Sequence, residues 1–140
     1  LVVPILSSSS NFPSGEIARE LKHRRRVLAL HFFMPPHLVP LVEVVSSDAT
    51  DPAIAQDVVA LMKTLGKAPI WVKKDVPGFV GNRIQHAMMR EAMYLIDEGI
   101  CDAEAVDTAV RYGFGFRFIA CGPIMPTRAS APTGLLPNPA

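Results

Sequence analysis

The sequence lacks the features that would assign it at once to several common classes of protein. Its two cysteines, Cys101 and Cys121, lie far apart and form no CxxC or zinc-binding pattern, so we expect free thiols, a reducing compartment and no bound metal. No apolar run approaches the roughly 18 to 20 residues of a membrane span. The formal net charge of +1 provides no general attraction to nucleic acid or membrane. We therefore expect a cytoplasmic protein with no nucleic-acid or membrane partner.

A glycine-rich GxGxxG turn after a strand is also absent from the 140 residues. The first residue is Leu1, inside an apolar run, and not a methionine. The stretch from Pro123 to Ala140 holds five prolines, which disfavour regular structure. We interpret the chain as a piece of a larger protein whose dinucleotide-binding first half, if it has one, lies upstream. The residues that are present, 49% of them hydrophobic, suffice for one ordinary domain.

The most informative part of the sequence consists of two apolar runs, Val27–Leu30 and Leu41–Val45, separated by a turn at Pro35. His31 ends the first run, and Glu43 lies in the middle of the second. A buried carboxylate needs a partner, and a turn that folds the runs together would place these two side chains side by side. A carboxylate bonded to one ring nitrogen leaves the other nitrogen available as a base. The alternative is a core histidine paired with a structural glutamate, and both interpretations stay open at this point.

The remaining patterns predict strands and helices in alternation, followed by helices alone. The expected strands are residues 1–6, 27–30, 41–45 and 69–73, and the expected helices are residues 14–21, 50–65, 79–99 and 102–112, with Ser14 as the first N-cap. Such an alternation is typical of an open α/β sheet. We predict half of such a sheet over residues 1–74, a helical segment over 75–122 and an irregular proline-rich tail over 123–140.

Three polar stretches are candidates for ligand contacts. The serines Ser7–Ser10 follow a strand, where α/β sheets bind ligands, and a flexible linker is the alternative. Asn82 begins a long helix whose N-terminus offers hydrogen-bond donors, and an ordinary first-turn polar residue is the alternative. The basic run Lys22–Arg26 suits either a solvated turn or a phosphate contact, and the solvated turn is favoured because the run lies between a helix and a strand.

Five short motifs follow one another in a fixed order between Ile5 and Pro123. They are Ser7 to Ser10, His31-Phe32-Phe33 with Pro35, Leu41 to Val45, Pro77-Gly78-Phe79-Val80 with Asn82-Arg83, and Gly113-Phe114-Gly115. In order and spacing they resemble the 3-hydroxyacyl-CoA dehydrogenases. No single motif is decisive, but five in register are highly specific. The Pro35-Pro36 pair and Gly122-Pro123 are most similar to the short-chain branch that includes the lambda-crystallin type of L-gulonate dehydrogenase.

The resemblance implies a role for each candidate residue. His31 corresponds to the catalytic base, which removes the 3-hydroxyl proton as hydride passes to NAD+, and Glu43 corresponds to the glutamate that orients this histidine. Ser10 corresponds to the serine that contacts the substrate oxygen near the nicotinamide, and Asn82 to the asparagine that holds the reacting carbonyl. The implied fold is the C-terminal part of a Rossmann-like NAD-binding domain over residues 1–74, then the start of an all-α C-terminal domain over 75–122.

The resemblance also implies an NAD cofactor, an acyl-CoA or small hydroxy-acid substrate, a place in fatty acid metabolism and a homodimer of the whole protein. Met34 departs from the family pattern, which has an asparagine near the cofactor at this position, and a thioether lacks the two donors of an amide. Two alternatives stay open: a related dehydrogenase of a sugar acid or a carnitine-like alcohol, and a non-catalytic structural fragment. Without a glycine-rich turn, we expect the 140-residue chain alone to bind NAD poorly and to be inactive.

Overall fold

The computed structural model describes residues 3–10 and 12–124 of the chain. It divides into two compact units, Leu1–Ala87 and Met88–Ala140, which are described in turn. Most of the proline-rich tail predicted over residues 123–140 lies outside the described residues, as does the start of the first predicted strand.

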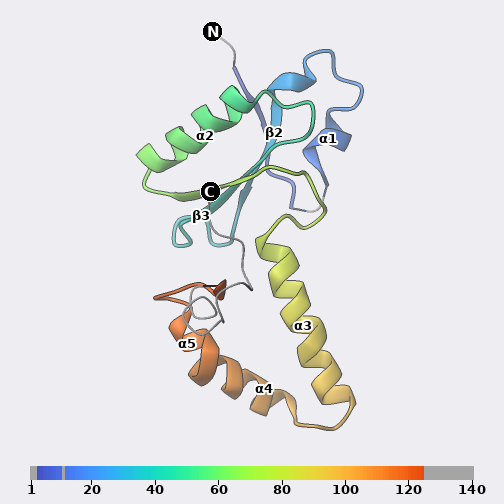
Figure 1. Ribbon diagram of the computed structural model, residues 1–140, viewed down its shortest axis with the longest axis vertical. Helices are drawn as coiled ribbons and strands as arrows, with labels where there is room; N and C mark the ends of the chain where they lie inside the picture. The colour runs from blue at the N-terminus through green and yellow to red at the C-terminus, as the bar shows by residue number, and fades with distance from the viewer. Residues whose placement is uncertain (1–2, 11, 125–140) are drawn as a thin grey trace, which may run out of the picture. The chain divides into compact units, whose positions relative to one another are not determined.

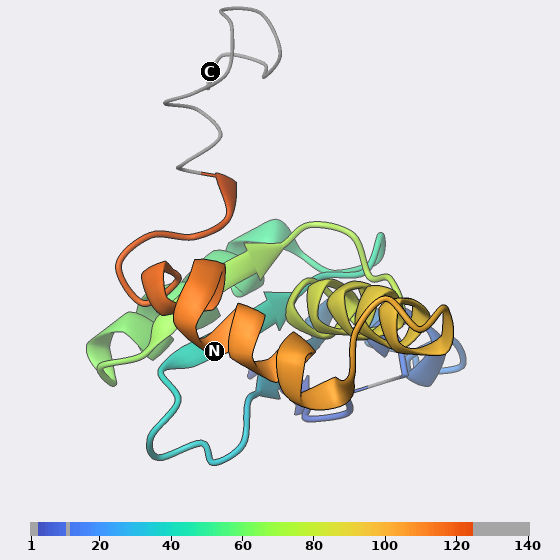
Figure 2. The same ribbon diagram turned by 90° about the horizontal axis from the view of Figure 1, so that it is seen from below.

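The first unit is built on a four-stranded sheet with the order β1-β2-β3-β4. Its strands are β1 (Ile5–Ser7), β2 (Val27–Phe32), β3 (Leu41–Val45) and β4 (Ala68–Val72). The pairs β1–β2 and β3–β4 are parallel, whereas β2 and β3 form an antiparallel pair. The loop over residues 33–40, which joins β2 to β3, projects beyond the sheet (Figure 2). The α/β fold class expected from the sequence is thereby confirmed.

Side chains that alternate along β2 and β3 divide the core between the two faces of the sheet. One face carries Leu28 and Leu30 of β2 and Val42 and Val44 of β3, and the helix α2 (Pro52–Thr64) packs against them. Figure 1 shows α2 and α1 (Ser14–Ile17) on either side of the sheet. The face away from α2 carries a smaller apolar cluster, which consists of Ala29, Val45, Val72 and Phe79.

The starts of the helices differ from the sequence expectation. Ser14 was expected to cap α1, but the N-cap is Pro13 and no side chain caps the helix. The Ser14 hydroxyl instead donates to Asp75 at 2.9 Å, because a fully buried hydroxyl needs a partner and this carboxylate supplies one. The helix α2, expected from residue 50, begins at Pro52: Asp51 rather than Thr50 caps it, by accepting the N–H of Ala53.

The helix α3 (Gly81–Asp97) runs from the first unit into the second and buries none of its side chains. The second unit continues with α4 (Ala103–Ala109), which Asp102 caps by accepting the N–H of Ala105 at 2.8 Å. A π-helical turn, Val110–Phe114, and the short α5 (Gly115–Arg117) follow. No helix among the described residues is long and apolar enough to cross a membrane.

Candidate active site

The antiparallel pairing of β2 and β3 makes His31 and Glu43 direct partners across the sheet. Both project from the face opposite α2, and both are buried, with 4% of His31 and none of Glu43 exposed. The distance from His31 Nδ1 to Glu43 Oε2 is 2.7 Å. A carboxylate can only accept, so Nδ1 carries the ring proton and Nε2 of the neutral imidazole is left with a lone pair.

The second oxygen of Glu43 binds the start of α3. Its Oε1 accepts the backbone N–H groups of Val80 at 3.0 Å and Gly81 at 2.9 Å. These N–H groups have no partner within the helix, and the positive end of the dipole of this 17-residue helix lies with them. Three donors therefore compensate the buried negative charge of Glu43, which a single histidine would not do.

Ser10 completes a chain of hydrogen bonds at the edge of the sheet. Its Oγ lies 3.1 Å from His31 Nε2, the ring nitrogen that faces away from Glu43. β1 and β2 are parallel, so the serine loop that follows β1 and the end of β2 meet at the same edge. Ser10 is exposed, whereas His31 is buried, so His31 Nε2 lies at the boundary between the core and solvent.

Two phenylalanines enclose the imidazole. The Phe33 ring centroid lies 5.0 Å from that of His31, and the Phe79 centroid lies 5.4 Å from it, both in tilted arrangements. Phe79 is 1% exposed and has a φ of 47°, in the left-handed region that phenylalanine rarely adopts. The preceding Gly78 also has a positive φ, 76°, which a glycine adopts without strain. This backbone turn delivers Phe79 to the ring and Val80 and the residue after it to Glu43.

The other predicted residues take different places. Asn82 lies in the first turn of α3, next to the residues that bind Glu43, but its side chain makes no hydrogen bond to any of the described residues. Met34 is 80% exposed and contributes nothing to the enclosure of His31. The structure therefore brings together Ser10, His31 and Glu43, and it leaves the Asn82 side chain without a hydrogen bond to any described residue.

Sequence reasoning missed the groups that hold this pair from the side of α3. Phe33, Phe79 and Val80 were recognised as parts of motifs without an assigned role, and Gly81 was not singled out at all. The sequence did contain an indication, since a glycine shortly before a helix, as in Gly78-Phe79, is typical of a left-handed turn that changes the direction of the chain. The need of a buried carboxylate for further donors was the second signal.

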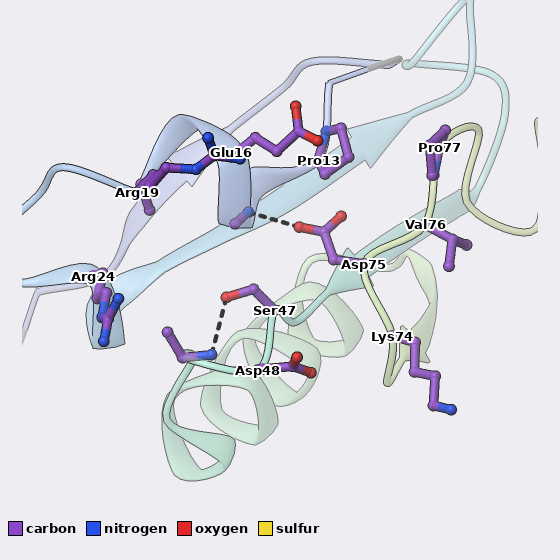
Figure 3. Close-up of a pocket in the computed structure, with 13 residues that line it drawn as sticks. Pro13, Glu16, Arg19, Arg24, Ser47, Asp48, Lys74, Asp75, Val76 and Pro77 are labelled. Carbon is purple, nitrogen blue, oxygen red and sulfur yellow. Dashed lines mark hydrogen bonds between the residues drawn. The ribbon is translucent and has the colours of Figure 1, made fainter.

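A separate hollow of about 640 Å³ lies between α1 and the loops over residues 47–49 and 74–77 (Figure 3). None of the residues that line it is Ser10, His31, Glu43 or Asn82. Its charged lining is balanced between three basic and three acidic side chains: Arg19, Arg24, Lys74, Glu16, Asp48 and Asp75. Among the described residues, no cluster of three or more His, Cys, Asp or Glu side chains could hold a metal ion.

Comparison with known protein families gives two matches that together cover most of the chain. A family model described as "3-hydroxyacyl-CoA dehydrogenase, NAD binding domain" matches residues 3–76. A second, described as "3-hydroxyacyl-CoA dehydrogenase, C-terminal domain", matches residues 78–129. Ser10, His31 and Glu43 fall in the first match, and Asn82 falls in the second.

Curated relatives agree with this match. A 3-hydroxyacyl-CoA dehydrogenase of Gibberella moniliformis is 46% identical over 123 residues, which are 87% of this chain and 38% of the relative. A 5-formyl-3-hydroxy-2-methylpyridine 4-carboxylate 5-dehydrogenase of Mesorhizobium japonicum is 35% identical over 86% of this chain and 39% of its own length. An L-carnitine dehydrogenase of Pseudomonas syringae is 37% identical, with coverages of 86% and 38%.

Among solved structures, the crystal structure of a 5-formyl-3-hydroxy-2-methylpyridine 4-carboxylic acid 5-dehydrogenase, described as an NAD+ dependent dismutase, superposes with a TM-score of 0.87. The two proteins are 33% identical, and the match covers 91% of this chain and 41% of that one. The chain thus spans about two fifths of the length of the proteins that it matches.

Proposed function

Because the chain belongs to the 3-hydroxyacyl-CoA dehydrogenase family, we propose that the whole protein oxidises the hydroxyl group of a 3-hydroxyacyl-CoA to a ketone, with NAD+ as the hydride acceptor. One observation carries the proposal. A buried histidine has a carboxylate at 2.7 Å on one ring nitrogen and a hydroxyl at 3.1 Å on the other, at the sheet edge where substrates bind in this class of fold.

In this proposal His31 is the general base. The carboxylate of Glu43 holds the ring proton on Nδ1, so Nε2 accepts the proton of the substrate hydroxyl while the carbon–hydrogen bond breaks. The imidazolium that forms lies beside the buried Glu43 carboxylate, which stabilises the positive charge. In the reverse direction, His31 donates this proton to the ketone oxygen.

Two further side chains act on the substrate oxygen in this proposal. The Ser10 hydroxyl lies at Nε2 and is placed to donate to the oxygen that His31 protonates or deprotonates. The side-chain amide of Asn82 makes no hydrogen bond to the described residues, so both its donors are available for the same oxygen. Ser10 is also the residue that we assign to the cofactor, on the nicotinamide side.

NAD+ supplies the hydride chemistry when bound, and the chain supplies the base and the orientation. The residues present fit the reacting end of such a cofactor, because polar side chains meet at the carboxyl ends of β1 and β2. The turn that would bind the pyrophosphate, a GxGxxG sequence after a strand, is not among the 140 residues.

For the substrate, a specific second candidate exists. The family also includes L-carnitine dehydrogenases, one of which is 37% identical to this chain. A carnitine-like alcohol or a sugar acid would use the same base without a CoA group. Kinetics of the whole protein with short 3-hydroxyacyl-CoA esters, carnitine and a sugar acid decide between these substrates, and turnover of carnitine alone would overturn the acyl-CoA assignment.

The decisive experiment on the reaction class is the substitution His31→Gln in the whole protein. We expect kcat to fall on the order of 10²-fold or more, the usual contribution of a positioned general base, with a smaller change in KM. His86→Gln is the matched control, because His86 is exposed on α3. Turnover within twofold of the wild type in His31→Gln would remove His31 from the catalytic role.

We further propose that the whole protein is a cytoplasmic homodimer that functions in fatty acid metabolism. We also propose that the boundary between its two domains lies near residue 75. Support for the dimer comes from α3, which exposes a row of large apolar side chains. They are Ile84, Met88, Met89 and Met93, each at least 43% exposed. Burial of such a surface is favourable in water. Light scattering of the whole protein, with a monomer as the contradicting result, tests the dimer.

A further inference from the structure

Four groups around the proposed base form a closed cycle of contacts. His31 binds Glu43 through Nδ1, and Glu43 binds the backbone N–H of Gly81 at 2.9 Å. Gly81 lies against the ring of Phe33, and the Phe33 ring returns to His31 with its centroid at 5.0 Å. The position of the imidazole is therefore set from two directions, through hydrogen bonds on one side and through an aromatic ring on the other.

The contact between Gly81 and Phe33 leaves no room for a side chain. A Cβ added at Gly81 would lie 3.0 Å from Cε2 of Phe33 and closer still to Cζ, well inside the distance that carbon atoms normally keep. The backbone of Gly81 is not the reason for a glycine, because its φ is not among the positive values of this chain. Residue 81 must be a glycine for steric reasons, because the ring of Phe33 occupies the place of a Cβ.

We propose that Gly81 and Phe33 are positioning residues, which seat the first turn of α3 so that its two N–H groups hold the Glu43 carboxylate against His31. Without a side chain at residue 81, the ring of Phe33 packs directly on the helix backbone. The N–H groups of Val80 and Gly81 then converge on Glu43 Oε1, which leaves Oε2 for the imidazole. The inference rests on the proposed role of His31, and its structural part can be measured without any turnover.

The substitution Gly81→Ala distinguishes a positioning role of Gly81 and Phe33 from a simple change in helix propensity. Alanine favours helices over glycine, so without the ring the substitution would strengthen the first turn of α3 and its N–H bonds to Glu43. With the ring in place, the added methyl group pushes Phe33 and the helix start apart. The two explanations therefore predict changes of opposite sign at the same N–H groups.

The measurement is nuclear magnetic resonance on the 15.2 kDa chain, labelled with nitrogen-15. In Gly81→Ala we expect hydrogen exchange at the amides of residues 80 and 81 to accelerate about tenfold or more, as it does when a bond to a charged acceptor is lost. We also expect the Nδ1 proton of His31 to shift, because both its carboxylate partner and its aromatic neighbour move. Gly122→Ala is the control, since a Cβ at Gly122 meets nothing within 4 Å.

A double variant keeps the inference testable if Gly81→Ala alone does not fold. In Phe33→Leu with Gly81→Ala, the smaller side chain makes room for the methyl group, and we expect protection of both amides to return toward the wild-type value. Unchanged exchange and an unchanged His31 proton in Gly81→Ala would overturn the inference. So would a double variant that folds but leaves both amides as unprotected as in the single variant, or one that also fails to fold.

Kinetics of the whole protein add the functional part. We expect Gly81→Ala to lower kcat by about tenfold with a small change in KM, because a displaced base affects the chemical step more than substrate binding. If His31→Gln retains turnover, the proposed function fails, yet the amide and imidazole signals still report whether Gly81 and Phe33 position His31. If the signals change as expected but kcat of an active wild-type protein does not, the positioning role in catalysis is wrong.

Discussion

At the scale of single residues, Glu43 has two different partners for its two oxygens. Oε2 accepts from the His31 ring, and Oε1 accepts from two backbone N–H groups of α3. A glutamate on a central strand can do this only because it is fully buried beside a helix start, where donors are available without water. The carboxylate that binds His31 is thus itself held by N–H groups at the start of α3.

The two roles of Glu43 can be separated with Glu43→Gln. A glutamine oxygen still accepts the N–H groups of Val80 and Gly81, so the fold is expected to persist. Its amide NH2 then faces His31 Nδ1 and must donate, which moves the ring proton to Nε2. With Nε2 protonated, the atom beside Ser10 is no longer a base, and we expect kcat of the whole protein to fall on the order of 10²-fold.

Nitrogen-15 spectra of the His31 ring measure this change of tautomer directly in the chain. Glu91→Gln, at an exposed position of α3, is the matched control and should leave the ring signals unchanged. A ring that keeps its proton on Nδ1 in Glu43→Gln would contradict the assigned hydrogen-bond directions.

The sequence was sufficient to find this pair but not its surroundings. His31 and Glu43 stand out because each is a polar residue in an otherwise apolar run, and burial without a partner is costly. Phe33 and Gly81 give no such signal, because a phenylalanine and a glycine are unremarkable wherever they occur. Their contact depends on where α3 begins in space, and no local pattern determines that.

At the scale of elements, Asp75, in the loop after β4, forms hydrogen bonds with the start of α1. Its Oδ2 accepts the Ser14 hydroxyl at 2.9 Å and the N–H of Gly15 at 2.7 Å, across a separation of about 60 residues. The helix that these bonds hold has only four residues and cannot persist by itself. Both of these bonds to the start of α1 therefore come from a single carboxylate.

We expect Asp75→Ala to lower the free energy of unfolding of the chain by about 2 kcal/mol, because it leaves a buried hydroxyl and an N–H group without a partner. Chemical denaturation measures the change. Asp48→Ala is the control: Asp48 lines the same hollow but is exposed, and a change within about 0.5 kcal/mol is expected. Equal effects of the two substitutions would show that Asp75 does not fasten α1.

Ser14 also shows where element prediction from sequence reaches its limit. A serine before a helical pattern is a normal N-cap, and that rule is local. The structure uses the Ser14 side chain for a partner 61 positions away, and such a contact overrides the local preference. β2, β3, β4 and α2 were predicted to within about two residues because their apolar side chains pack on one another, as the pairing of Leu30 with Val44 illustrates. The first strand, predicted over residues 1–6, is Ile5–Ser7, and its residues are less buried.

At the scale of the whole molecule, the chain contains the hydrogen-bonded pair of His31 and Glu43 but no glycine-rich turn for a pyrophosphate. Dinucleotide affinity in such folds depends largely on that turn and on the helix that follows it. In the proposed function, Ser10 and His31 would contact only the nicotinamide end of the cofactor. Such contacts do not offset the free energy lost when a flexible ligand is immobilised.

We therefore expect the 140-residue chain to bind NADH with a Kd weaker than about 1 mM by isothermal titration calorimetry. The crystallised relative described as an NAD+ dependent dismutase is the positive control. Micromolar affinity of the chain would contradict this expectation and would indicate that a second copy, or another site of the chain, completes the cofactor pocket.

The hairpin of β2 and β3 also determines the order in which the site assembles. His31 and Glu43 are 12 residues apart, whereas Gly81 lies 38 residues beyond Glu43. Short loops close quickly, and chains with local contacts fold faster than chains with distant ones. During synthesis on the ribosome, we therefore expect His31 to meet Glu43 before α3 has left the exit tunnel. The helix is then expected to dock onto a carboxylate that the nascent hairpin has already placed.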